Sequence, residues 1–312
     1  MKSHLHLLLL FLCSIFSTST LLAQLSGNKE ARDWWINNVN WDGNTHWSAY
    51  LIQSPAYMGP NALPVPSVSK GVIDNQTKLR FSLQTHFSNG DDTQNPFLSF
   101  NYAVAPKKIA FFAFLYPIEH FAMSNKVRDE RRLSDAYFVP RGFAAGDLYF
   151  GAAIQILKNK QNLPDIALRM TTKTASGGAK GGSRNTDAPG YYFDLSLGKK
   201  WFFNQEDEEH SMSIYSMLGL FVWETNALSL PQNDALLFGI GTDIHLSKYT
   251  IHSDFGGFWG YKNNGDRPII YRFGIDRAFG KGQYLLKYQA GIHDFPYNSF
   301  EAGIVFYLTK QK

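Results

Sequence analysis

The sequence is almost without cysteine, the residue that forms disulfides and thiolate sites. Its only cysteine among 312 residues is Cys13, which lies in an apolar stretch near the start. The chain after that stretch therefore has no disulfide, no thiolate nucleophile and no cysteine ligand for a metal. It also has no run of about 18 apolar residues, which excludes a transmembrane helix there. The formal net charge of +4 is too small to indicate binding to nucleic acid.

The first residues have the pattern of a secretory signal peptide. Lys2 precedes an apolar stretch from Leu7 to Phe16, and small residues come before Ala23. The stretch is too short for a spanning helix and is followed at once by polar residues. We expect residues 1–23 to be removed after export in a Gram-negative bacterium.

What the chain does contain is typical of an outer-membrane barrel. Aromatic residues make up 15% of it, it has 26 glycines, and its mean hydropathy is only −0.24. Apolar and polar residues alternate clearly in 236–246 and again in 249–259. A two-residue turn at 247–248 would pair these segments so that every outward apolar residue faces another. Because a one-residue slip would move a whole face, this agreement favours a membrane hairpin.

The same alternation, followed along the chain, predicts an all-β fold. We expect a transmembrane antiparallel up-and-down β-barrel with twelve strands. The expected strands are 79–88, 97–105, 109–117, 148–156, 165–173, 191–198, 212–224, 236–246, 249–259, 268–277, 283–293 and 299–309. An even number returns both ends of the barrel to the periplasm, with the longer connections outside. The longer connections are expected at 89–96, 118–144, 176–190, 225–234, 261–267 and 294–298, and a periplasmic turn at 201–211.

The two ends of the mature chain carry further signals. The stretch EAGIVFYL (301–308) resembles the C-terminal signal read by the barrel-insertion machinery, which we expect as a partner together with outer-membrane lipid. Residues 24–78 are rich in aromatic residues and proline, and we expect them either to plug the lumen or to cap the periplasmic rim. The barrel itself is expected at 79–309, as a monomer without a cofactor.

One short stretch suggests an enzyme. In KLRFSLQTHFSNG, His86 and Ser88 resemble the His-x-Ser-Asn-Gly stretch of outer-membrane phospholipase A. That resemblance implies catalytic residues on the lipid-facing side. In an extended strand, both residues lie on the same face as Arg80. An arginine that faces lipid near the middle of the membrane costs roughly 2–4 kcal/mol. They are therefore expected to face the lumen, and a lipid hydrolase remains the alternative to a protein without enzymatic activity.

Two sets of residues are expected to face the lumen. The first is aromatic, gathers toward the external end, and reads either as a vestibule for a small apolar or aromatic solute or as packing under the long loop. Its members are Phe97, Phe114, Tyr116, Tyr149, Tyr192, Phe221 and Trp223. The second set is polar, with Arg80, His86, Arg169, Asp194, Asp243, His245, His252, Asp254, Arg272 and Asp276.

Within the polar set, four residues leave two interpretations open. The expected pairing places Asp243 opposite His252, with His245 and Asp254 close by on the same face. Two histidines and two aspartates could hold a divalent cation. The other interpretation, which we adopt, is a charge-balanced lumen wall with no metal.

The motifs of the barrel region resemble those of known families. GDLYFG (146–151) and ALRMTTKTASGG (167–178) are similar to segments of the phenol-degradation meta-pathway outer-membrane family. SPAYMGPNALPVP, DAPGYYFD and PQNDALLFGIG resemble a group of uncharacterised outer-membrane proteins. The resemblance implies an outer-membrane barrel, and solute transport by association. The sequence therefore predicts passive passage of a small apolar or aromatic solute, with a lipid hydrolase or a structural, partner-binding barrel as alternatives.

Overall fold

The chain is described as a computed structural model that covers most of its length. The described residues are 29–45, 47–133, 140–158, 160, 162–178, 182–204, 207–225, 227 and 231–308. The predicted signal peptide, 1–23, lies outside the described residues. None of the helices within the described ranges is long and apolar enough to cross a membrane.

The chain divides into two compact units, Met1–Gly43 and Asn44–Lys312. In the first, helix α2 (Lys29–Val39) buries Trp35 and Val39, which lie one turn apart on the same helix face. The amide of Asn38 donates to the carbonyl of Trp34, one turn earlier. The second unit holds all the strands, and the remaining description concerns that unit.

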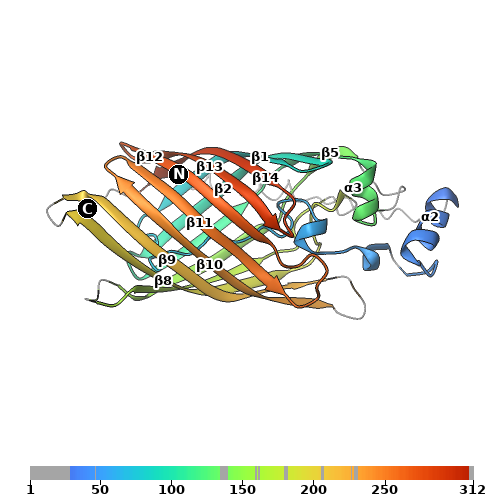
Figure 1. The fold of residues 1–312 in the computed structure, drawn as a ribbon, viewed down its shortest axis with the longest axis horizontal. Helices are drawn as coiled ribbons and strands as arrows, with labels where there is room; N and C mark the ends of the chain where they lie inside the picture. The colour runs from blue at the N-terminus through green and yellow to red at the C-terminus, as the bar shows by residue number, and fades with distance from the viewer. Residues whose placement is uncertain are drawn as a thin grey trace, which may run out of the picture. The chain divides into compact units, whose positions relative to one another are not determined.

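Among the described residues, twelve strands form one closed antiparallel sheet, as the sequence predicts (Figure 1). Strand β1 pairs with β2 on one side and with β14 on the other, so the sheet has no free edge around the wall. The wall consists of β1 (Lys78–Phe87), β2 (Asp91–Ala105), β3 (Ile109–Leu115), β6 (Leu148–Leu157), β7 (Asp165–Lys173), β8 (Gly190–Asn204), β9 (Asp207–Glu224), β10 (Gln232–Leu246), β11 (Tyr249–Gly260), β12 (Ile269–Phe279), β13 (Gly282–His293) and β14 (Asn298–Tyr307).

The register of the wall follows the alternation in the sequence. In the β10–β11 hairpin, Leu246 lies opposite Tyr249 and Ile240 opposite Phe255, as predicted. Ser247 makes the tight turn with a left-handed backbone, at φ 53°. The outward apolar residues of neighbouring strands therefore meet across every pair and form a continuous apolar face.

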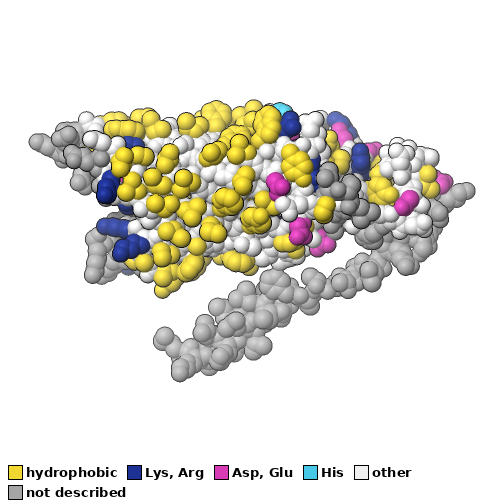
Figure 2. Space-filling view, turned by 90° about the horizontal axis from the view of Figure 1, so that it is seen from below, with side chains coloured by type: hydrophobic (Ala, Val, Ile, Leu, Met, Phe, Trp, Pro, Cys, Tyr) yellow, Lys and Arg dark blue, Asp and Glu magenta, His cyan; other side chains and the backbone are white. Residues whose placement is uncertain are grey.

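Large apolar side chains are exposed all around this wall. Leu83, Leu218 and Leu286 are each about 60% exposed, and Figure 2 shows hydrophobic side chains spread along the barrel. Exposed apolar surface of this extent is unfavourable in water and suits contact with lipid. The outer face thus has the chemistry of a membrane-spanning barrel.

The predicted loop 118–144 contains a second, smaller structure. Strand β4 (Glu119–Met123) pairs with the beginning of β2, strand β5 (Arg141–Ala144) pairs with β4, and helix α3 (Asn125–Glu130) lies between them. The expected loop 89–96 is wrong for the same reason, since β2 already begins at Asp91. Its first residues pair with β4 beyond the apolar wall, and the outward residues of β2 there, Asp92 and Gln94, are polar, so the alternation carries no lipid-facing signal.

The predicted turn 201–211 is likewise shorter than expected. Strands β8 and β9 continue as a ladder to Asn204 and Asp207, with a register irregularity near Phe202. The aromatic side chains of Trp201, Phe202 and Phe203 are exposed on consecutive residues. Three aromatics in a row break the alternation on which the sequence prediction rests, which explains the missed extension.

The two ends of the barrel differ. Lys78 lies opposite Tyr307, so the barrel begins and ends at the same end, which we call the terminal end. The opposite end carries the β4–α3–β5 insertion and the connections around Thr186, Asn264 and Phe295, and we call it the loop end.

Residues 51–74, which we call the lumen segment, run through the barrel from the loop end to the terminal end. At the loop end, Ser54 Oγ donates to the carbonyl of Asn264 at 2.7 Å. At the terminal end, the backbone N–H of Ile73 donates to Gln155 Oε1 at 3.0 Å. The expected N-terminal region 24–78 is thus divided at Gly43, and its second part belongs to the same compact unit as the barrel. Two short 3-10 helices, η1 (Trp47–Tyr50) and η2 (Pro55–Tyr57), precede the extended part.

Candidate functional site

The lumen is the candidate functional site because both predicted residue sets point into it. The seven aromatic residues of the predicted vestibule come together toward the loop end. Phe114 stacks on Tyr149 with ring centroids 4.6 Å apart, and Phe97 lies 5.8 Å from Phe114 and 5.4 Å from Tyr116. Tyr192, Phe221 and Trp223 belong to the same buried cluster.

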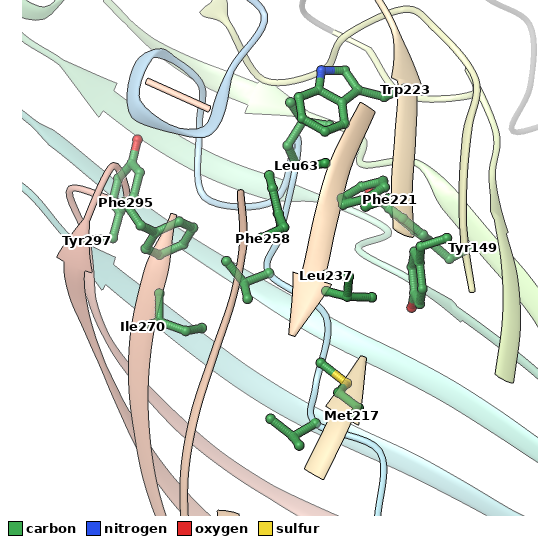
Figure 3. Close-up of a cluster of buried hydrophobic side chains, with 14 of the residues drawn as sticks. Leu63, Tyr149, Met217, Phe221, Trp223, Leu237, Phe258, Ile270, Phe295 and Tyr297 are labelled. Carbon is green, nitrogen blue, oxygen red and sulfur yellow. The ribbon is translucent and has the colours of Figure 1, made fainter. Parts of the chain in front are cut away.

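The lumen segment covers this aromatic cluster. Leu63, Val65 and Val68 pack into it, and Figure 3 shows Leu63 between the rings of Trp223 and Phe258. The indole N–H of Trp223 donates to the carbonyl of Gln53 at 3.1 Å. The aromatic rings therefore contact the lumen segment of the same chain, and their role as a path for solute stays a prediction.

Several members of the cluster are missing from the sequence prediction. Phe258 is completely buried, 5.0 Å from Phe221 and 5.5 Å from Trp223 between ring centroids. Leu237 and Met217 lie in the same cluster. Phe258 has the same parity as His252 and Asp254, so the alternation of β11 contains the signal that would have identified it.

A buried polar cluster lies at the loop end. We call it the loop-end cluster, and it consists of Asp91, Glu119, Arg131, Arg184 and Tyr297. Asp91 Oδ2 lies 2.7 Å from Arg131 Nη1 and accepts from Tyr297 Oη at 2.7 Å. Arg184 forms a second ion pair with Asp91 and lies 3.6 Å from Glu119. All five side chains are almost fully buried, so each charge is held by partners rather than by water.

The lumen segment contributes an amide to this cluster. Asn61 Nδ2 donates to Glu119 Oε2 at 2.7 Å and to Asn95 Oδ1 at 3.0 Å. Asn61 is itself buried. The segment is therefore bound at the loop end by two buried hydrogen bonds from one amide, to the carboxyl group of Glu119 and to the side-chain oxygen of Asn95.

The two carboxylates of the loop-end cluster differ in their electrostatics. They lie beyond the apolar wall, where the outward neighbour Asp92 is polar and exposed. Burial raises the pKa of Asp91, but the guanidinium groups of Arg184 and Arg131 outweigh it, and the net shift is downward. Burial also raises the pKa of Glu119, and there the lowering by Arg184 is too weak to reverse it. Asp91 is thus the anchoring charge, and Glu119 is a carboxylate whose ionisation is unfavourable.

A second polar group lies nearer the terminal end. We call it the terminal-end network, and it consists of Lys70, Tyr215, Asp243, His252 and Asp276. Lys70 Nζ of the lumen segment lies 2.5 Å from Asp243 Oδ2, and Tyr215 Oη donates to Asp243 Oδ1 at 2.9 Å. The ring nitrogens of His252 lie 2.8 Å from Asp243 and 2.9 Å from Asp276. A histidine can donate to two carboxylates at once only when both nitrogens carry protons.

The residues considered for a cation do not converge on one point. Asp243 is held as described above, and Asp254 accepts from Arg272 Nη1 at 2.9 Å. His245 Nδ1 faces Thr250 Oγ1 at 3.0 Å. Within the described ranges, no group of three or more His, Cys, Asp or Glu side chains is arranged to hold a metal ion. The geometry has the form of a charge-balanced wall.

The arginines of the wall bind the backbone of the lumen segment. Arg272 Nη2 donates to the carbonyls of Val65 at 2.7 Å and Pro66 at 2.9 Å. Arg169 pairs with Asp194 at 2.7 Å and donates to the carbonyl of Ser67 at 2.9 Å. These donors satisfy backbone carbonyls of an extended stretch that forms no ladder of its own, among them those of the buried residues Val65 and Pro66. Of the remaining predicted polar residues, Arg80 forms an ion pair with Glu301 across the β1–β14 seam.

His86 and Ser88 do not meet. His86 Nδ1 lies 2.7 Å from Ser299 Oγ, and Nε2 lies 3.1 Å from Asn95 Oδ1. Ser88 instead donates to the carbonyl of Asp91 in the turn between β1 and β2. Ser299, His86 and Asn95 form a hydrogen-bonded series, but all three are buried on the lumen side, away from lipid. The arrangement therefore gives no support to a lipid hydrolase built on His86 and Ser88.

Comparisons with known proteins find likeness only in the fold. No protein-family model matches the sequence, and a search of curated proteins finds no match. Among solved structures, an outer-membrane channel from Pseudomonas putida F1 is similar at 10% identity and a TM-score of 0.48, over 78% of this chain and 97% of that chain. The translocator domain of the autotransporter NalP from Neisseria meningitidis is similar at 11% identity and a TM-score of 0.39, over 75% of this chain and 89% of that chain. The CymD monoaromatic hydrocarbon channel is similar at 9% identity and a TM-score of 0.37, over 77% of this chain and 90% of that chain. The assignment as a closed barrel rests on the strand pairing described above.

Proposed function

We propose that the protein is an outer-membrane barrel that is closed at rest by its lumen segment and passes a small apolar or aromatic solute when that segment shifts. The apolar outer wall, the even number of strands and the longer connections at one end support the location. The same features orient the barrel, with the terminal end in the periplasm and the loop end outside. The proposal then depends on what the lumen segment does.

The observation that carries the proposal is the contact between Leu63, Val65 and Val68 and the aromatic cluster. These side chains pack against the aromatic rings in the way that an apolar solute would. An aromatic solute that stacks on a ring gains roughly 0.5–1.5 kcal/mol from each contact. A solute that enters the cluster would therefore compete with the segment and shift the closed state toward an open one.

The binding of the segment is compatible with release. Its central part is held by hydrogen bonds from Arg272 and Arg169 to backbone carbonyls, and no covalent link fixes it. Water could take over each of these hydrogen bonds once the segment moves, at a small net cost per bond. The segment is thus bound noncovalently in the lumen of its own barrel and can leave it reversibly.

A reversible lock tests the proposal directly. A Cβ placed at Gly239 would lie 2.6 and 3.1 Å from the two methyl groups of Val68. This spacing suits a disulfide, so Val68→Cys combined with Gly239→Cys should link the segment to β10. The mature chain has no other cysteine to compete. Single-channel conductance in bilayers and whole-cell uptake of a labelled monoaromatic compound should both fall to background when the variant is oxidised, and return with a reducing agent.

The single variant Val68→Cys is the matched control and should conduct equally in both redox conditions. If the oxidised double variant still conducts and takes up the compound like the reduced form, passage does not require movement of the segment, and the proposal is wrong.

A structural or partner-binding barrel is the second candidate, and the complete burial of the loop-end cluster favours it. Such a barrel would conduct in neither redox state. The lock therefore separates the two candidates, because only a channel can regain conductance on reduction.

A further inference from the structure

The direction of the lumen segment has a consequence for the chain that precedes it. Residue 74 lies at the terminal end, a few residues before β1 begins at Lys78. Followed backward, the segment runs away from that end and emerges among the loops. The part of the barrel unit that precedes the segment therefore approaches the lumen from the loop end.

Contacts at three places hold the segment at the loop end. Gln53 Nε2 donates to the carbonyl of Thr186 at 2.7 Å. The N–H of Ala56 donates to the carbonyl of Gly265 at 3.1 Å, and the N–H of Gly59 donates to the carbonyl of Ser183 at 2.8 Å. The partners Ser183 and Thr186 precede β8, whereas Gly265 precedes β12. Residues 53–59 are thus fixed on both sides of the external mouth.

The part of the barrel unit ahead of Leu51 has no return path to the terminal end. The lumen is already occupied by residues 60–74, which pack against the wall at Gly239 and Gly198. A route along the outside of the wall would place backbone N–H and C=O groups in lipid, and each unsatisfied group costs several kcal/mol there. Asn44 is the first residue of the barrel unit, and its side chain is exposed.

We infer that the beginning of the barrel unit, the described residues from Asn44 to Tyr50, is presented on the outer surface of the cell. The protein then has a function beyond solute passage, since its barrel displays the first residues of its own unit outside the membrane. The inference rests on the orientation adopted for the proposed function and is independent of whether any solute passes.

Cysteine labelling on intact cells tests the inference. Three single variants are compared in a Cys13→Ser background: Asn44→Cys, Asn263→Cys in the loop-end connection before β12, and Lys281→Cys in the β12–β13 turn at the terminal end. All three native side chains are exposed. A membrane-impermeant maleimide is added to cells before and after the outer membrane is permeabilised, and labelling is normalised to the denatured chain.

We expect Asn44→Cys and Asn263→Cys to label to within about twofold of each other on intact cells, and Lys281→Cys only after permeabilisation. If Asn44→Cys labels only together with Lys281→Cys, the inference is wrong while the orientation stands. If Lys281→Cys labels on intact cells and Asn263→Cys does not, the orientation itself fails. A protease site inserted between Asn44 and Thr45 gives a second readout, since added protease should cut it on intact cells.

Discussion

The two ends of the lumen segment are held in different ways. At the loop end, Met58 and Leu63 are buried and Asn61 joins a cluster in which Asp91 and Arg184 are completely buried. At the terminal end, the side chain of Lys70 is 38% exposed although its ammonium group lies 2.5 Å from Asp243. A buried charge is costly to leave without its partner, whereas a pair near water contributes little. The comparison indicates that the segment is sealed at the loop end and loosens first at the terminal end.

The largest expected effect comes from removing two rings that the loop end packs against the segment. Tyr149→Ala combined with Trp223→Ala deletes two fully buried side chains of the aromatic cluster. Each large-to-small change in a packed core costs roughly 3–5 kcal/mol. We expect a strongly lowered urea midpoint of the folded barrel, measured by its faster gel migration without heating, together with higher resting ion conductance.

A matched pair on the lipid face provides the control. Tyr249 and Trp259 lie on β11 with their side chains about half exposed. Tyr249→Ala combined with Trp259→Ala removes the same two residue types from the outward side. Equal loss of stability in both double variants would show that the cluster contributes no more than the lipid face, and that the seal is not at the loop end.

The second prediction removes the charge that holds the loop-end cluster together. Asp91→Asn leaves the guanidinium groups of Arg184 and Arg131 buried with only neutral partners at that position. Breaking one side of a buried ion pair costs about 3–5 kcal/mol, and we expect the urea midpoint to fall accordingly. Asp92→Asn changes the next residue, which is exposed, and should leave the midpoint unchanged. Similar midpoints for the two variants would contradict the role assigned to Asp91.

The sequence predicts the wall of the barrel far better than its contents. Alternation along β10 and β11 determines both the register and the inward parity of residues such as His252, because each outward residue must face lipid. The same parity correctly places His86 in the lumen rather than on the lipid side. In the wall, the same requirement, that every second residue faces lipid, is repeated along each strand. A single sequence is therefore enough to reveal it.

The lumen segment has no such constraint. Its contacts are set by single partners far away in the chain, such as Arg272 Nη2 with the carbonyl of Val65 and Asn61 Nδ2 with Glu119 Oε2. Gly71 is left-handed at φ 75° and passes so close to Gly198 that a Cβ would clash, yet nothing in the local sequence indicates the approach. Long-range pairs of this kind have no periodic signal, so sequence reasoning leaves open whether the segment fills the lumen or caps a rim.

The third prediction uses the opposite pKa shifts at the loop end. The pKa of Glu119 is raised above its ordinary value of 4.5, so the stability that it contributes is complete below that pH and is lost as the pH rises through the folded-state pKa. The pKa of Asp91 is lowered, so its contribution is present above its ordinary pKa of 3.8 and is lost only at lower pH. Above pH 4.5, Glu119 therefore makes the barrel less stable as the pH rises.

Glu119→Gln should remove this dependence. The urea stability of the wild type relative to the variant should fall with rising pH above 4.5, by at most about 1.4 kcal/mol per pH unit, and then level off. Glu130→Gln on α3 removes an exposed carboxylate and serves as the control for loss of a surface charge. A wild-type-to-variant difference that rises with pH would show that the ionised form of Glu119 is favoured by its neighbours and not opposed by burial.

The smallest effect is expected at the terminal end, with Lys70→Ala. Asp243 keeps its hydrogen bonds from His252 and Tyr215, and the ammonium group that is lost is partly in water, so the change in stability should be only about 0.2–1 kcal/mol. The conductance should respond more than the stability, because the ion pair of Lys70 helps to hold the segment in its closed position but contributes little to the stability of the folded barrel. We therefore expect more frequent brief openings in single-channel records at a nearly unchanged urea midpoint. Lys78→Ala, which breaks the exposed pair with Asp74, is the control and should alter neither. A large fall in the midpoint for Lys70→Ala would mean that the terminal end is sealed as firmly as the loop end, and that the segment does not loosen from the periplasmic side.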